Sequence, residues 1–287
     1  MSALDDISAT ISSVASKVGP SVVGVNRQGS GFVAAKGYVV TNAHNVRGES
    51  LVTFGDGRQV AAQVAGVDID GDLAVLAVDT ADLPAVEWST TQPALGDVVV
   101  ALANPRGRGL RATIGTVSST GRGFRGPRGR RIAGNIEHTA ALSRGSSGSP
   151  VLDREGRVVG VNTNRLQEGF YQALASTEEL ARRIAGLSKG EEPHRRRLGT
   201  ALAPPHVTKR LRAAAGLPEA EGLLVRGVEE GSPAEAAGLR QGDVLVTANG
   251  QALTSVDALY EALDGEGDLE LTVVRATEQV EVVVHFS

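Results

Sequence analysis

Gly145-Ser146-Ser147-Gly148-Ser149-Pro150 is the most informative segment of this 287-residue chain. Its small residues let the backbone curl, so that two N–H groups can point to one spot beside the Ser147 hydroxyl. The oxyanion of a tetrahedral intermediate would sit at that spot. Gly/Ser-rich segments are common, however, and most of them are only turns. The hexapeptide therefore indicates catalysis only if other segments supply the groups that a serine nucleophile needs.

Two upstream segments supply candidate groups. Residues 38–44 (YVVTNAH) read as a strand that delivers His44 at its end, and residues 70–76 (DGDLAVL) place Asp72 in a turn before a buried strand. A serine hydroxyl needs a neighbouring base, and a carboxylate can orient that base and stabilise its protonated form. Taken singly, His44 reads equally as a strand-end histidine and Asp72 as a turn cap. The order His44, Asp72, Ser147 is that of the chymotrypsin-type triad, and it differs from the orders in subtilisin and in the α/β-hydrolases.

These segments resemble the HtrA/DegP family of trypsin-like proteases. In the first two thirds the resemblance rests on residues 29–33 (GSGFV), 40–44 (VTNAH), 72–76 (DLAVL), 95–99 (LGDVV), 103–107 (ANPRG), 113–118 (TIGTVS) and 145–148 (GSSG). In the last third, residues 231–234 (GSPA) and 237–245 (AGLRQGDVL) resemble a bacterial PDZ domain. The resemblance implies a mostly β chain: a chymotrypsin/trypsin-like double Greek-key β-barrel followed by a small α/β PDZ domain.

The chain departs from the family pattern at three positions. The family usually has Asn where Ser146 stands, Gly where Ser149 stands, and a hydrophobic residue where Asn45 follows the histidine. We interpret these departures as tuning of the site. The alternative that they leave open is a catalytically weak or silent chaperone, or a PDZ peptide-binding scaffold, on a protease fold.

The resemblance implies an ATP-independent serine endopeptidase of the protein quality-control type. Ser147 would attack the scissile carbonyl, His44 would move the proton, and Asp72 would orient His44. The N–H groups of Gly145 and Ser147 would form the oxyanion hole. The expected substrates are unfolded or misfolded polypeptides, and no cofactor is expected.

Composition narrows the other classes of function. Hydrophobic residues make up 41% of the chain and charged residues 22%, as in ordinary soluble domains. The absence of Cys excludes disulfides and thiolate chemistry, and the scattered histidines predict no metal site. The net charge of −4 argues against nucleic-acid binding. Residues 106–131 hold eight arginines but one aromatic, so we interpret them as a solvated loop region and expect no nucleic-acid partner.

The sequence indicates less about the location and the oligomeric state of the protein than about its fold. No stretch approaches the length of a membrane span, so no integral membrane segment is expected. The acidic start MSALDD predicts a cytoplasmic protein if Met1 is the native start, and export is the alternative. The family resemblance implies a homotrimer joined through the N-terminal segment. Its aliphatic stripe at Ile7, Ile11, Val14 and Val18 fits that role, or fits a helix that only covers its own barrel.

We predict four segments along the chain: an N-terminal helical segment (1–21), a trypsin-like domain (22–188), a polar linker (189–196) and a PDZ domain (197–287). By the resemblance, residues 121–134 form a regulatory loop. A capping box at Ser176 and Glu179 predicts a helix before the linker.

The resemblance also places residues around the nucleophile. Ala141, six positions before Ser147, is expected at the base of the primary specificity pocket, with Leu142 and Asn162 beside it. Such an apolar floor predicts cleavage after small or aliphatic residues, because a substrate cation would be left desolvated and unpaired. His138 is the only rival base, and no aspartate turn is placed to orient it.

A PDZ domain captures a chain end by adding it as a strand, while loop N–H groups receive the terminal carboxylate. Residues 197–200 (Arg197, Leu198, Gly199 and Thr200) match the place of that loop, and Leu202 falls on the pairing edge that follows. The predicted partners are therefore peptide C-termini. Leu259 and Leu263 are candidates for the apolar wall of the groove, or plain core residues.

Overall fold

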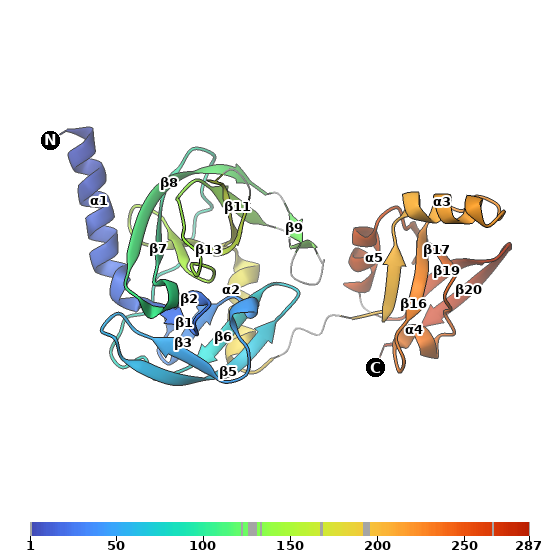
Figure 1. Cartoon of the computed structure of the whole chain (residues 1–287), viewed down its shortest axis with the longest axis horizontal. Coiled ribbons are helices and arrows are strands. Elements are labelled where there is room, and N and C mark those ends of the chain that lie inside the picture. Colours follow the sequence, from blue (N-terminus) through green and yellow to red (C-terminus); the bar gives the residue numbers. More distant parts are fainter. Residues whose placement is uncertain are drawn as a thin grey trace. The chain divides into compact units, whose positions relative to one another are not determined.

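The computed structural model describes residues 2–121, 123–125, 131–132, 134–166, 169–191, 196–265 and 267–286. The chain divides into two compact units, residues 1–193 and 194–287 (Figure 1). The unit boundary falls inside the predicted linker, of which residues 192–195 lie outside the described residues. The predicted regulatory loop at 121–134 also lies partly outside them.

The first unit contains two closed six-stranded antiparallel barrels. Several strands of each barrel are short runs rich in Val, Leu and Ala whose side chains are buried on both faces of the strand. The first barrel has the order β1-β2-β3-β6-β5-β4 and the second the order β11-β14-β13-β12-β7-β8. The strands of the first barrel are β1 Val22–Val25, β2 Gly29–Ala35, β3 Tyr38–Thr41, β4 Ser50–Thr53, β5 Gln59–Asp68 and β6 Leu73–Ala77. Those of the second are β7 Val98–Ala103, β8 Arg111–Thr120, β11 Asn135–His138, β12 Pro150–Leu152, β13 Val158–Arg165 and β14 Tyr171–Ala175.

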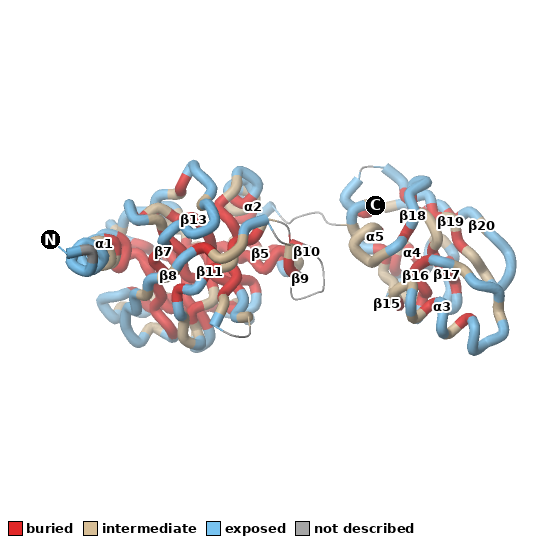
Figure 2. The backbone as a smooth tube through the Cα atoms, turned by 90° about the horizontal axis from the view of Figure 1, so that it is seen from above, coloured by how far each residue is buried: buried red, intermediate tan, exposed pale blue. Residues whose placement is uncertain are grey.

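Two helices and a small ribbon accompany the barrels. Helix α1 (Ala3–Val18) buries Val14 and Val18 in the core cluster that also takes residues from both barrels, while its first turns stay exposed (Figure 2). Helix α2 (Glu178–Ser188) buries Leu180 and Leu187 in the same cluster. A two-stranded ribbon joins β9 (Phe124–Arg125) to β10 (Arg131–Ile132). None of the described helices is both long and apolar enough to cross a membrane.

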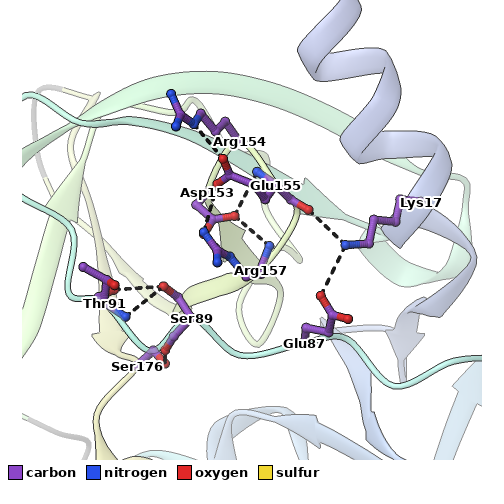
Figure 3. Close-up of polar contacts among 9 residues, drawn as sticks. All are labelled: Lys17, Glu87, Ser89, Thr91, Asp153, Arg154, Glu155, Arg157 and Ser176. Carbon is purple, nitrogen blue, oxygen red and sulfur yellow. Dashed lines mark hydrogen bonds and ion pairs between the residues drawn. The ribbon is translucent and has the colours of Figure 1, made fainter.

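The start of α2 corrects one prediction. Thr177, not Ser176, is the N-cap, and its hydroxyl accepts from the Leu180 N–H. The Ser176 hydroxyl is instead buried and donates to the Ser89 carbonyl, as Figure 3 shows. The cap moves by one residue because tertiary contacts use the hydroxyl that the local pattern assigned to the helix.

The second unit is a sheet of order β15-β16-β17-β19-β20, with β18 pairing β17. Helix α3 (Pro205–Ala214), the short α4 (Pro233–Ala236) and α5 (Val256–Leu263) accompany it. Its strands are β15 Thr200–Ala203, β16 Leu223–Val228, β17 Val244–Ala248, β18 Gln251–Ala252, β19 Leu269–Arg275 and β20 Glu278–Val284. The predicted fold class, a double barrel followed by a small α/β domain, is confirmed.

Candidate active site

His44 and Asp72 meet at the ends of neighbouring strands. His44 lies in a short 3-10 turn (Ala43–Asn45) directly after β3, and Asp72 directly precedes β6, which pairs with β3. His44 Nδ1 is 2.9 Å from both carboxylate oxygens of Asp72, and the His44 N–H donates to Oδ1 at 3.2 Å. Asp72 holds a left-handed backbone (φ 49°), and the Asn42 side chain donates to its carbonyl at 2.8 Å. The left-handed backbone of Asp72 and the hydrogen bond from Asn42 together direct the Asp72 carboxylate toward the His44 imidazole.

The Asp72 carboxylate is 2% exposed, so a charge there needs hydrogen-bond donors. A third donor is Thr163, whose hydroxyl lies 2.5 Å from Oδ2. With Nδ1 facing the carboxylate, the neutral imidazole carries its proton on Nδ1 and leaves Nε2 as the basic nitrogen. Thr163 was not singled out from the sequence, where a threonine late in a strand gives no distinguishing signal.

Ser147 lies in the loop between β11 and β12. Its hydroxyl donates to the Thr163 carbonyl at 3.0 Å, and within the described chain it makes no hydrogen bond to His44. Thr163 thus bonds Asp72 through its side chain and Ser147 through its backbone. Nucleophile–base hydrogen bonds are often unformed without substrate, and rotation of one side-chain torsion would free the hydroxyl from Thr163.

Carbonyls of this loop accept hydrogen bonds, while two of its N–H groups are free of acceptors among the described residues. The Gly145 carbonyl accepts from the Ser30 hydroxyl at 2.8 Å, and the Ser146 carbonyl accepts from the Ser149 N–H at 3.1 Å. In the part of the chain that the structure describes, the N–H groups of Gly145 and Ser147 donate to no protein acceptor. Gly145 has a φ of 90°, which a residue with a side chain rarely adopts. The geometry therefore leaves free the two donors that the sequence nominated for an oxyanion hole.

Two departures from the family pattern, Ser146 and Ser149, have buried side chains. Ser149 is fully buried, and its hydroxyl accepts from the Asn162 side chain at 3.0 Å. Ser146 is 3% exposed, and its hydroxyl has no partner among the described residues.

A cavity of about 210 Å³ opens beside Ser147. It is lined by Leu142, Ser143, Arg144, Gly145, Ser146, Ser147, Asn162, Thr163, Asn164, Arg165 and Tyr171. Leu142 and Asn162 thus lie where the sequence predicted a substrate pocket. Ala141 does not: it is exposed and absent from the lining. Successive side chains of an extended segment alternate in direction, and here Ala140 and Leu142 turn to the barrel core, so Ala141 faces away from it.

His138 is not placed to act as the base. It is fully buried, its Nε2 lies 2.8 Å from the Asn162 side-chain oxygen, and its ring stacks on Tyr171. Burial lowers the pKa of His138, and the Asn162 hydrogen bond offsets this only in part. A buried neutral histidine bonded to an amide is a structural residue.

The predicted peptide-binding residues cluster at one end of β15, which is an edge strand of its sheet. Arg197 is exposed and pairs with Glu229 at 3.7 Å, whereas the Leu198 side chain is buried in the domain core. Gly199 has a φ of 80°, and a Cβ there would lie 2.2 Å from that of Ser232. Thr200 begins β15, and Leu202 packs partly buried against the core.

Of the two groove candidates on α5, Leu259 and Leu263 are buried at 2% and 3% exposure. They belong to the core of the domain, which is the alternative that the sequence left open.

Comparison with known proteins gives this architecture a context. Residues 29–161 match the model of the trypsin-like peptidase domain, and residues 224–275 match that of the PDZ domain. The HtrA-type protease AlgW, solved with a decapeptide, superposes with a TM-score of 0.75 at 25% identity, covering 96% of this chain and 97% of its own. The chain is HtrA/DegP-like. The serine endoprotease from Yersinia pestis is similar to this HtrA/DegP-like chain at a TM-score of 0.72 and 26% identity, covering 96% of each chain.

Curated relatives agree with this assignment. A probable periplasmic DegP-like serine endoprotease of Chlamydia muridarum is 36% identical over 248 residues, which is 82% of this chain and 48% of that protein. The putative serine protease HhoB of Synechocystis is 34% identical over 254 residues, covering 82% of this chain and 60% of its own. The HtrA/DegP-like chain thus spans about half the length of the first of these relatives.

Proposed function

We propose that this protein is a serine endopeptidase whose nucleophile is Ser147. The observation that carries the proposal is the buried Asp72 carboxylate, held 2.9 Å from His44 Nδ1 and joined to Ser147 through Thr163. This arrangement selects the tautomer in which His44 Nε2 is a base.

The reaction follows from these positions. His44 Nε2 takes the proton as Ser147 Oγ attacks the scissile carbonyl, and Asp72 stabilises the resulting imidazolium. The free N–H groups of Gly145 and Ser147 donate to the developing oxyanion. His44 then protonates the leaving amine. In the second half of the reaction His44 takes a proton from water as the water attacks the acyl-enzyme carbonyl, and it returns that proton to Ser147 Oγ as the acyl–serine bond breaks. No step uses ATP.

We propose unfolded or misfolded polypeptides as substrates, on the strength of the relatives' family. The prediction of cleavage after small or aliphatic residues loses the support of Ala141 and keeps that of Leu142. Relatives described as periplasmic favour export over the cytoplasmic location predicted from the first residues. We also propose a homotrimer.

The PDZ domain is proposed to bind peptide C-termini at the free edge of β15. Gly199, with its positive φ, shapes the loop before that edge, and Arg197 adds positive charge near it. Calorimetry on the full chain should give micromolar binding of peptides with hydrophobic C-termini. Amidated peptides should bind much more weakly, and equal affinity of the two forms would contradict this part of the proposal.

The proposed activity is tested by Ser147→Ala, with Ser50→Ala as the matched control. Ser50 is buried, at 2% exposure, whereas Ser147 is partly buried, and the Ser50 hydroxyl has no partner among the described residues. Casein hydrolysis should fall by up to ~10⁶ in Ser147→Ala, because triad members act as a unit. It should persist in Ser50→Ala. Equal hydrolysis by the two variants would support the alternative, a silent peptide-binding scaffold.

A further inference from the structure

The Ser147 carbonyl is held by two donors from the first barrel. The Ser30 N–H donates to it at 2.9 Å, and the Asn45 side-chain amide donates to it at 2.8 Å. The next N–H in the loop, that of Gly148, donates to the Asn162 carbonyl at 2.7 Å. The peptide group that follows the nucleophile is therefore fixed at both of its polar atoms.

Asn45 is built into this position. It is 1% exposed, and its Nδ2 also donates to the Thr41 hydroxyl at 3.0 Å, while that hydroxyl donates to the Ser30 carbonyl at 2.7 Å. Room for the amide depends on Gly29, where a Cβ would lie 2.2 Å from the Asn45 side chain. Gly148 is equally required, because a Cβ there would lie 2.3 Å from the Ser30 carbonyl oxygen.

Burying the Asn45 amide lowers the stability of the folded chain, which a buried apolar side chain at this position would not do. The Asn45 side-chain oxygen has no hydrogen-bond partner among the described residues, and an unsatisfied buried polar atom costs about 1–3 kcal/mol. A hydrophobic residue would fill the same space without that cost. The amide adds hydrogen bonds to the Thr41 hydroxyl and to the Ser147 carbonyl, and the second of these reaches the loop of the nucleophile.

The backbone connection makes that contact relevant to catalysis. Asn45 directly follows His44 in the chain, and its side chain donates to the carbonyl of Ser147. The backbone next to the base is therefore linked to the backbone of the nucleophile. Holding the peptide after Ser147 restricts rotation of the Ser147 backbone. The directions of both the hydroxyl and the N–H of Ser147 depend on that backbone.

We propose that Asn45 is a positioning residue, which couples the backbone carrying His44 to the loop carrying Ser147. The inference rests on the proposed endopeptidase function. Loss of the Asn45 amide should lower the reactivity of Ser147 and leave substrate binding nearly unchanged, because Asn45 contacts the Ser147 carbonyl but is not itself among the residues that line the cavity.

The test compares full-length wild type with Asn45→Leu and with the control Asn135→Leu. Asn135 is also 1% exposed, and its side chain has no partner among the described residues. Four quantities are measured: the melting temperature, the rate constant for inactivation by a fluorophosphonate, and kcat and KM on a fluorogenic peptide copied from a mapped casein cleavage site. Asn45→Leu should lower kcat and the inactivation rate about tenfold, the equivalent of one hydrogen bond, with KM within about twofold. Asn135→Leu should change neither rate.

The possible results either support or overturn the role proposed for Asn45. Unchanged kcat and inactivation rate in Asn45→Leu overturn the inference, even if the melting temperature falls. Should Asn45→Leu not fold, Asn45→Ser, whose side chain is too short to make the same contact, takes its place with the same expectation. A wild type that neither hydrolyses the peptide nor reacts with the fluorophosphonate overturns the proposed function and this inference with it.

Discussion

Among single residues, Asp72 determines which nitrogen of His44 is basic. Asp72→Asn keeps the shape but places an amide against Nδ1, where its N–H favours the tautomer protonated on Nε2. We expect kcat for casein hydrolysis to fall by ~10⁴ near neutral pH, with little change in the melting temperature. Asp70→Asn, two residues earlier and only half-buried, is the control and should keep its activity. A loss of less than tenfold in Asp72→Asn would show that His44 does not depend on Asp72.

His138 should make stability depend on pH. Burial holds the pKa of His138 below its ordinary value of 6.5, so the unfolded chain binds this proton more readily than the folded chain. Stability from His138 is therefore complete above pH ~6.5 and declines as the pH falls below that value. His138→Gln, which cannot take up a proton, should show a smaller drop in melting temperature between pH 7 and pH 5. An identical drop in melting temperature in the unaltered protein and in His138→Gln would show that His138 does not make stability depend on pH.

The site residues that could be predicted from the sequence are those that stand inside sequence motifs. His44, Asp72 and Ser147 stand in segments with a local pattern, and the structure brings His44 to Asp72 and joins both to Ser147 through Thr163. Thr163, Ser30 and Asn45 act through contacts between segments distant in sequence, which no local pattern encodes. Ala141 does not line the cavity beside Ser147, because counting from the nucleophile does not show which way a side chain in an extended segment faces.

At the scale of elements, α1 is attached through its C-terminal half. Val14 and Val18 are 2% and 3% exposed, and Lys17 Nζ contacts the Glu87 carboxylate and the Glu155 carbonyl, as Figure 3 shows. The exposed ion pair contributes little, so the attachment depends on the buried valines. Val14→Ala with Val18→Ala should lower the free energy of unfolding by about 2–4 kcal/mol in denaturant melts. Ile7→Ala, at a position 43% exposed, should change it by less than about 1 kcal/mol.

Elements were predictable in proportion to their length and apolar content. The buried strand expected directly after Asp72 and the aliphatic helical stripe from Ile7 to Val18 correspond to β6 and α1. Strands β11 and β12 were not expected, because NIEH and PVL are too short for a period to appear. The cap of α2 shifted by one residue because Ser176 is used by Ser89.

For the whole molecule, exposed aliphatic residues favour assembly. Leu4 and Ile7 on α1 are 74% and 43% exposed, and Leu95 and Val98, at and just before the start of β7, are 71% and 51% exposed. Helix α1 packs against β7 and β8, so these residues belong to neighbouring elements of one unit. Light scattering should give about three times the 29.6 kDa chain mass, and Leu4→Ser with Ile7→Ser should lower it. A monomer at micromolar concentration in the unaltered protein would contradict the trimer.

The overall architecture was the most predictable level, because several motifs in a fixed order constrain the fold jointly. The chain lacks Cys, so no disulfide braces the hydrogen-bonded barrels, and their core clusters are built largely of Val, Leu and Ala. The substrates and the oligomeric state were not predictable in the same way, since they depend on surfaces and partners outside the chain's own motifs.

The central claim is that Ser147 is an activated nucleophile, and a covalent probe tests it most directly. The protein is treated with a fluorophosphonate, its intact mass is measured, and the modified residue is located by peptide mapping. The account predicts one adduct per chain, on Ser147, and none in Ser147→Ala or after denaturation before treatment. An unmodified native protein, or an adduct that persists in Ser147→Ala, would contradict it.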